Sequence, residues 1–204
     1  MDLSNPSKFV FATNNPNKKA EIMPLFREAG LCLCSPAEYG VIVLPGETGN
    51  TFHENAEIKA VETFCALNGK GITGNHVFAD DSGFEVEALG GLPGVDSALF
   101  LGEGTSYEVR NEYILREMEN AENRRCRFVC VICHVLPSGE AHFYLDEVVG
   151  EVAKKACGTG GFGYDPIFYL PEYGKTMAEL DMDEKNKQSH RGKAIRKFIE
   201  AVCR

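Results

Sequence analysis

The pattern of apolar and polar positions predicts a strand followed by a helix at the start of the chain. A short apolar run from Phe9 to Ala12 is typical of a strand. A helix is expected to begin at Lys18, to be kinked or shortened by Pro24, and to end before Gly30. Its apolar positions recur at helical spacing: Ile22, Leu25 and Phe26.

Two capping boxes predict two further helices. Thr51 and Glu54 form the first, which opens a helix that ends near Asn68. We expect this helix to bury Ile58, Val61 and Cys65. Residues 105–108 form the second box, which opens a helix to about Glu119.

The second half of the chain contains a hairpin and a last helix. Residues 76–79 read as a strand that runs into Asp80, and residues 126–136 and 141–152 read as a hairpin. The last helix is expected to begin at Ser189, and its buried positions are Ile195, Phe198, Ile199 and Val202. Alternating elements followed by a hairpin predict an α/β protein with a mixed sheet.

Composition and charge narrow the range of partners. The chain has 204 residues, which suits one domain, and it carries a net charge of −9. Such an acidic chain is a poor candidate for binding nucleic acid, but a few local cations can serve a small polyanion. Neither a signal peptide nor a membrane-spanning stretch is visible, so we expect a cytoplasmic protein without a membrane partner.

Eight cysteines raise the question of a zinc site. Cys130 and Cys133 have a tempting spacing, with Cys126 and His134 near by. Because the segment reads as a strand, Cys130 and Cys133 should point to opposite faces. We therefore expect buried, reduced thiols here in preference to a metal site or disulfides.

The first candidate site is the loop at residues 13–17 with Lys18. A helix N-terminus and a lysine favour an anion such as phosphate. An ordinary strand–helix turn capped by Asn17 explains the same residues.

The second candidate is the acidic pair Asp80 and Asp81, expected at the end of a strand. Magnesium binds carboxylate oxygens and bridges phosphates, and Glu47 could complete such a site. The alternative is a solvated turn, since Asp, Ser and Gly are turn residues.

The third candidate is the glycine-rich segment 158–166. Its glycines allow close approach of a ligand, and Phe162 or Tyr164 could stack on a base. A bulge with packed aromatic rings is the alternative.

The fourth candidate is the segment 184–192. His190 and Arg191 fall in the first turn of the last helix, where the helix dipole disfavours cations. Side chains that violate a local preference of this kind often belong to a functional site. Both His190 and Arg191 can donate a hydrogen bond to a carbonyl oxygen. A solvated helix start explains them equally well.

Taken together, these motifs resemble those of the inosine triphosphate pyrophosphatase family, which acts on non-standard purine nucleoside triphosphates. The matching stretches follow the family order over nearly the whole chain. They are residues 11–18, 47–56 with Lys59, 79–83, 88–95, 158–168, 174–180 and 185–194.

The resemblance implies a fold and an activity. The fold is α/β, with two lobes around a long mixed sheet and an active-site cleft between them. Residues 1–204 would form one nucleoside triphosphate pyrophosphatase domain. The implied reaction is the magnesium-dependent hydrolysis of ITP, dITP and XTP to the monophosphate and pyrophosphate, by a homodimer.

The resemblance also implies roles for individual residues. Asp81 would be the proton acceptor, and the Mg²⁺ ligands would be Glu47, Asp80 and Asp81. The triphosphate would be held by Thr13, Asn14, Asn15, Pro16, Asn17, Lys18 and Lys59. Substrate and base would be contacted by Ser82, Phe162, Gly163, Tyr164, Asp165, Lys185, His190 and Arg191.

One segment departs from the family. Where relatives often carry Tyr-Ser-Ala-Arg, this chain has residues 96–99, Asp-Ser-Ala-Leu, so the role of that arginine is not carried over. Two other functions remain open at this point: a nucleotide sensor without turnover, and a nucleotidyltransferase that uses the same α-phosphorus chemistry.

Overall fold

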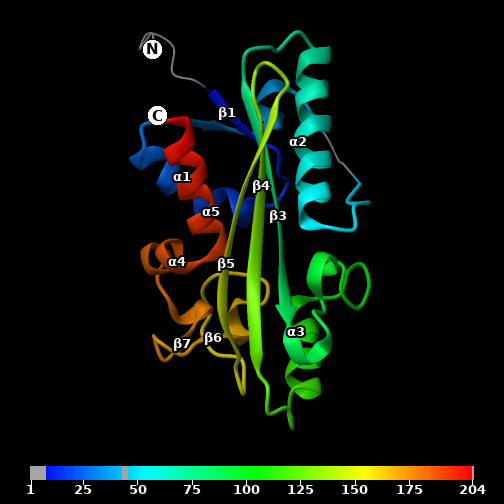
Figure 1. Cartoon of the computed structure of the whole chain (residues 1–204), viewed down its shortest axis with the longest axis vertical. Coiled ribbons are helices and arrows are strands. Elements are labelled where there is room, and N and C mark those ends of the chain that lie inside the picture. The colour runs from blue at the N-terminus through cyan, green and yellow to red at the C-terminus, as the bar shows by residue number, and fades with distance from the viewer. Residues whose placement is uncertain (1–7, 43–45, 204) are drawn as a thin grey trace. The chain divides into compact units, whose positions relative to one another are not determined.

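The computed structural model of the chain describes residues 8–42 and 46–203. Its strands are β1 (Lys8–Phe11), β2 (Cys32–Cys34), β3 (His76–Val86), β4 (Arg125–Val135), β5 (Ala141–Val152), β6 (Phe168–Leu170) and β7 (Lys175–Thr176). Its helices are α1 (Pro16–Glu28), α2 (Phe52–Gly69), α3 (Tyr107–Glu117), α4 (Met182–Gln188) and α5 (His190–Val202) (Figure 1).

The seven strands form one mixed sheet in the order β2-β1-β3-β4-β5-β6-β7. Strand β1 pairs in parallel with β2 and with β3, whereas β6 pairs antiparallel with β5 and with β7. The predicted α/β class with a mixed sheet is therefore confirmed. β2 is an edge strand, because β1 is its one strand neighbour in this order.

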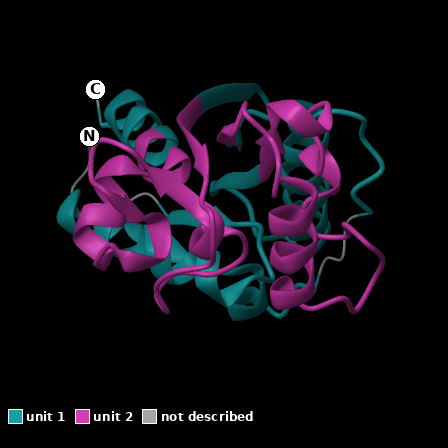
Figure 2. Ribbon diagram, turned by 90° about the horizontal axis from the view of Figure 1, so that it is seen from below, with its two compact units in different colours: residues 1–81, 130–145, 194–204 teal, residues 82–129, 146–193 magenta. Residues whose placement is uncertain are grey.

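The chain divides into two compact units, coloured separately in Figure 2. Unit 1 comprises residues 1–81, 130–145 and 194–204, and unit 2 comprises residues 82–129 and 146–193. That the whole chain acts as one domain stays a prediction.

Unit 1 has an aromatic core on one face of its strands. The ring of Phe78 stacks on Phe11 at 4.7 Å and on Phe26 at 5.4 Å between centroids. Phe198 of α5 joins the same buried cluster, so α1 and α5 cover this face. Helix α2 lies on the other side of the strands (Figure 1).

Unit 2 has a separate core. Phe84, Phe128 and Phe168 meet there as neighbouring rings, and the Tyr164 ring stacks on Phe84 at 5.1 Å. Ile114 of α3 is fully buried in the same cluster, which anchors that helix.

Helix α1 starts earlier than predicted. Asn15 is the N-cap and accepts hydrogen bonds from the backbone N–H groups of Asn17 and Lys18, so neither Asn17 caps the helix nor Lys18 starts it. Pro24 lies inside the helix without shortening it, because the helix continues to Glu28.

Helix α2 begins with the predicted capping box and ends at Gly69, but its buried face differs from the prediction. Val61 is 38% exposed and Cys65 is also exposed. The buried positions are Phe52, Asn55, Ala56, Lys59, Ala60, Thr63 and Leu67. The apolar pattern misled here because polar residues occupy part of the inward face.

Three boundaries in the rest of the chain also differ. β3 does not end at Asp80 but continues to Val86. Ser106, not Thr105, caps α3 through its side chain. The short helix α4 precedes Ser189, which accepts a hydrogen bond from the N–H of Gly192 and starts the last helix as predicted.

The cysteine segment is the predicted strand, β4. Cys130 belongs to the core that α1 and α5 cover. Burial, and then the nearby Glu57 carboxylate of α2, raises the pKa of Cys133, so Cys133 lies on the α2 side and the two thiols face opposite ways. All eight cysteines are free thiols.

In the part of the chain that the structure describes, no helix has the length and apolar character needed to cross a membrane.

Candidate active site

The loop between β1 and α1 is held by its own polar side chains. The Thr13 hydroxyl accepts a hydrogen bond from the N–H of Asn15 at 3.1 Å, and Asn14 lies between them in the loop. Pro16 occupies the first helical position, where no N–H is needed. The first free amides of α1 are thus already capped by Asn15, and what remains for an anion is the helix dipole and the Lys18 ammonium.

Asp80 and Asp81 lie in the middle of β3, where successive side chains point to opposite faces. Asp80 shares the face of Phe78, and its carboxylate lies 3.0 Å from Lys18 Nζ of α1. Asp81 faces the other way, and its carboxylate lies 2.6 Å from Lys59 Nζ of α2.

Lys59 joins Asp81 to the loop that precedes α2. Its ammonium also lies 2.8 Å from the Glu47 carboxylate. We call Lys18, Lys59, Glu47, Asp80 and Asp81 the acidic cluster, and all five residues belong to unit 1.

The electrostatics of the acidic cluster follow from its burial. Asp80 and Asp81 are 2% and 5% exposed, and Lys59 is 8% exposed. Burial raises the pKa of Asp81, against the attraction of Lys59, because desolvation penalises the charged form. Burial opposes the charge on Lys59, but attraction by Asp81, Asp80 and Glu47 outweighs it and raises the pKa of Lys59.

Asn55 is a contact of this site that the sequence analysis did not single out. Its amide Nδ2 donates to the second oxygen of Asp81 at 3.5 Å, and its Oδ1 accepts from the N–H of Gly49 at 2.8 Å. It lies one turn before Lys59, so both residues face Asp81 from α2. The sequence did contain a signal for it: Asn55 precedes Lys59 by four positions on a predicted helix, so the two side chains were expected on the same face.

The three carboxylates do not converge on one point. Glu47 and Asp81 approach the same ammonium, while Asp80 is paired with Lys18 on the other face of β3. Over residues 8–42 and 46–203, no group of three or more His, Cys, Asp or Glu side chains is placed to hold a metal ion.

A second group of predicted residues lies in unit 2, around the glycine-rich loop. The Asp165 carboxylate accepts from the N–H of Phe162 at 2.7 Å and lies 2.6 Å from Lys185 Nζ. Gly161 has φ +69°, and a Cβ there would collide with the Asp165 carboxylate. This loop therefore requires glycine where it closes over the Asp165–Lys185 pair.

The start of α5 contributes the remaining cations. Arg191 Nη2 donates to the Ser82 hydroxyl at 2.7 Å, and the His190 ring stacks on Phe128 at 4.7 Å. Lys185 Nζ and Arg191 Cζ lie 4.9 Å and 5.5 Å from the centre of the Phe162 ring. We call Ser82, Phe162, Asp165, Lys185, His190 and Arg191 the aromatic–cation cluster.

The two aromatic residues of the loop have different environments. Phe162 is half-buried and, with Gly163, lines a pocket of about 420 Å³ that also includes Tyr107 and Asn111. The Tyr164 ring is 3% exposed in the core, and its hydroxyl donates to the carbonyl of Ser97 at 2.8 Å. Phe162 is thus the ring available for stacking, and Tyr164 supports the loop from below.

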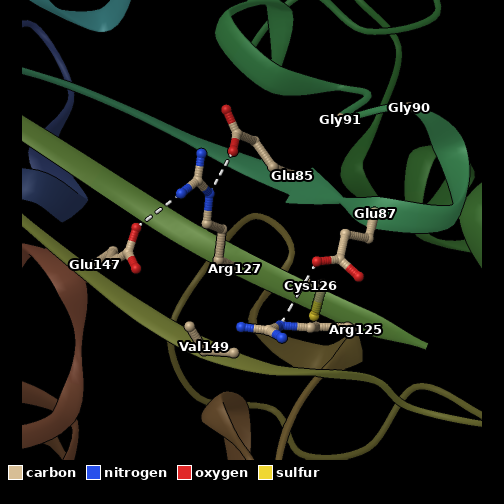
Figure 3. Close-up of a pocket in the computed structure, with 9 residues that line it drawn as sticks. All are labelled: Glu85, Glu87, Gly90, Gly91, Arg125, Cys126, Arg127, Glu147 and Val149. Carbon is tan, nitrogen blue, oxygen red and sulfur yellow. Dashed lines mark hydrogen bonds and ion pairs between the residues drawn. The ribbon is translucent and has the colours of Figure 1, made fainter. Parts of the chain in front are cut away.

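Another pocket, of about 450 Å³, is lined by none of the predicted residues (Figure 3). At its centre Arg127 of β4 pairs with Glu85 of β3 at 2.6 Å and with Glu147 of β5 at 2.9 Å. Each of the two arginines in its lining is paired with glutamates, Arg127 across three strands and Arg125 with Glu87, which indicates a structural ion network and not a catalytic centre.

Comparison with known proteins finds relatives that match almost the whole chain. At 45% identity over 95% of this chain and 91% of the relative, the chain is similar to a dITP/XTP pyrophosphatase of Thermus thermophilus. It is 42% identical, over 94% of this chain and 93% of the relative, to one of Listeria monocytogenes.

Solved structures of similar proteins align with nearly the whole chain. The Ham1 protein of Staphylococcus aureus aligns with a TM-score of 0.83 and 38% identity, over 96% of this chain and 98% of that one. A HAM1 protein from Coxiella burnetii aligns with a TM-score of 0.84 and 35% identity, over 97% and 98%. The sequence model of the Ham1 family matches residues 9–201, and the chain belongs to the Ham1 family.

Proposed function

We propose that this protein hydrolyses non-standard purine nucleoside triphosphates (ITP, dITP and XTP) between the α- and β-phosphates, releasing the monophosphate and pyrophosphate. The observation that carries the proposal is the acidic cluster, in which Lys18 at the start of α1 and Lys59 of α2 are paired with three carboxylates. Ammonium groups suit phosphate oxygens, and carboxylates suit the metal that accompanies them. The relatives named dITP/XTP pyrophosphatases support the substrate class.

The triphosphate would be bound by the loop and by two lysines. We assign Lys18 and Lys59 to the phosphate oxygens, because an ammonium has three N–H donors and can bind a phosphate oxygen while it keeps its carboxylate partners. The loop that positions them consists of Thr13, Asn14, Asn15, Pro16 and Asn17.

Magnesium is the metal we propose, with Glu47 and Asp81, which approach the same Lys59 ammonium, as its side-chain ligands. Asp80, on the other face of β3, would hold Lys18 in place. Mg²⁺ is usually bound through one or two carboxylates together with waters and substrate phosphates, so three converging side chains are not required. The oxygen-only donor set fits this hard cation. When bound, the ion would neutralise the charge that develops on the leaving pyrophosphate.

Asp81 is the residue we assign to the attacking water. Its carboxylate is buried, and its raised pKa brings it closer to the range in which a base accepts a proton near neutral pH. Lys59 and Asn55 hold its two oxygens from α2, which fixes the direction in which it can accept.

The base would be bound by the aromatic–cation cluster together with Gly163, while Tyr164 would support the loop from the core. Phe162 offers a stacking face, and Lys185, His190 and Arg191 can donate to a 6-oxo group. Adenine has a 6-amino group, a hydrogen-bond donor, at that position. The donors of the protein would then be buried without an acceptor. Each such mismatch costs about 1–3 kcal/mol, so a site of this kind can reject the wrong base strongly.

We also propose a homodimer, on the basis of the family resemblance. Light scattering coupled to size exclusion measures the mass directly. A monomer at all concentrations would contradict the proposal.

The experiment that tests the function is a panel of nucleoside triphosphates assayed with Mg²⁺ for released pyrophosphate. ITP, dITP and XTP should be turned over strongly and ATP very weakly. Asp81→Asn should lower turnover of ITP by about 10²–10⁴-fold, the usual contribution of a positioned base. Glu62→Gln, which changes an exposed carboxylate on the same helix as Lys59, is the matched control.

Other outcomes would assign another function. Tight binding of ITP without pyrophosphate release would indicate a sensor. Pyrophosphate release that requires a second acceptor molecule would indicate a nucleotidyltransferase. Near-normal activity of a folded Asp81→Asn protein would remove Asp81 from catalysis.

A further inference from the structure

Cys32 and Cys34 form a pair of thiols on β2 that the proposed function does not use. The two residues are separated by one position on a strand, so their side chains leave the same face. Their sulfur atoms are 3.9 Å apart, and both belong to unit 1. Cys34 is 8% exposed and Cys32 is half-buried, so a small ion can reach the pair from the Cys32 side.

The spacing of the sulfurs fits a bridging ion better than a direct bond. Two sulfur ligands at about 2.3 Å from a tetrahedral ion lie about 3.8 Å apart, close to the separation in the structure. A disulfide instead needs sulfurs at about 2.05 Å and Cα atoms no more than about 6.8 Å apart. Residues i and i+2 of a strand already have Cα atoms about 6.6 Å apart, near that upper limit.

Burial shapes the chemistry of Cys34. It raises the pKa of this thiol, because desolvation penalises the thiolate, so a cation displaces the proton when it binds. The nearby carboxylate of Glu38 is occupied, because it lies 3.1 Å from Lys19 Nζ and accepts from the N–H of Ser35.

We propose that Cys32 and Cys34 bind one soft, thiophilic cation of the zinc–cadmium class through both sulfurs. Soft thiolates select such ions over Mg²⁺, so the pair and the acidic cluster would not compete for metal. The protein supplies two ligands, and water completes the coordination. Each thiol loses its proton to solvent when the ion binds, and no oxidant is involved.

The chain offers matched controls for the test. Cys65 and Cys203 are exposed single thiols, so a Cys65→Ser/Cys203→Ser protein removes weak background binding. Cd²⁺ is added to this protein under a phosphine reductant, and the thiolate-to-cadmium ultraviolet band is recorded. We expect saturation at one ion per chain. Cys32→Ser and Cys34→Ser in the same background should each lower the affinity at least about tenfold, because each removes one of the two sulfur ligands.

A second measurement does not depend on the pair being replaceable. Phenylarsine oxide condenses with two neighbouring thiols, forms two As–S bonds and releases one water. Peptide mapping should place a single arsenic on the peptide that carries both Cys32 and Cys34, and this adduct should abolish the cadmium band. Absence of the band in the Cys65→Ser/Cys203→Ser protein would overturn the proposal. So would its persistence in folded Cys32→Ser or Cys34→Ser protein, or an arsenic adduct elsewhere.

Discussion

The His76–His134 pair of unit 1 predicts a specific loss of stability in acid. His76 Nδ1 and His134 Nε2 are 2.9 Å apart, and His134 is 1% exposed. The pair packs between the rings of Phe9 and Phe198. Burial, together with the nearby His76 and His142, lowers the pKa of His134 to about 3. Burial also lowers the pKa of His76.

The sign and size of the effect follow from proton linkage. Below its ordinary pKa of 6.5, His134 binds a proton in the unfolded chain but not in the native protein until about pH 3. Its contribution to the free energy of unfolding is therefore complete above pH 6.5 and is lost as the pH falls. At about pH 5 the loss spans about 1.5 pKa units, or about 2 kcal/mol at about 1.4 kcal/mol per unit. His76 adds to the loss in the same direction.

The assay compares urea unfolding at about pH 7.5 and about pH 5 for the protein and for His134→Gln. Glutamine keeps a hydrogen-bonding group for His76 but does not titrate, so the acid-induced loss should shrink by about 2 kcal/mol. His53→Gln, at an exposed position, should leave the loss unchanged. An equal loss in His134→Gln and in the parent protein would show that the buried pair does not control acid stability.

Two further predictions concern the proposed site, and a third concerns packing at the start of α5. Lys18→Ala should lower the catalytic efficiency for ITP by one to two decades, because a charge-assisted hydrogen bond is worth about 1.5–3 kcal/mol; an unchanged efficiency would remove Lys18 from the site. Arg191→Ala should lower ITP turnover far more than ATP turnover, and equal losses in steady-state assays would end the base-reading role. Gly192→Ala should lower the free energy of unfolding by about 1–3 kcal/mol, since its Cβ would collide with the backbone of Asn186. Gly69→Ala, whose Cβ meets open space, is its control in denaturant melts, and equal stability of the two variants would refute the steric argument.

The sequence predicted the framework of the fold because most long elements carry strong periodic signals. The hairpin of β4 and β5, the capping box of α2 and the last helix were all predicted close to their observed bounds. β2 and α4 were missed because three and seven residues provide too few turns or alternations to establish a period.

The candidate site was harder to predict in its geometry than in its residues. The residues Asp80–Gly83 have turn composition, yet they lie inside β3, because burial on both faces of the strand overrides local propensity. Adjacent acids in a turn could share one ion, but adjacent acids in a strand face opposite layers. Sequence spacing alone therefore did not reveal that Lys18 would pair with Asp80 and Lys59 with Asp81.

The charge of the acidic cluster also bears on what it can bind. Two lysines face three carboxylates there, so the cluster carries one more negative charge than positive when all five groups are ionised. A bare triphosphate would be repelled by that excess, whereas a triphosphate that arrives with its own divalent cations would not. Burial strengthens this preference, because water screens charges less in the interior. The proposed substrate is therefore the magnesium complex of the nucleotide. The three carboxylates hold the two lysines in place, and Glu47 and Asp81 would also serve as ligands for the incoming metal.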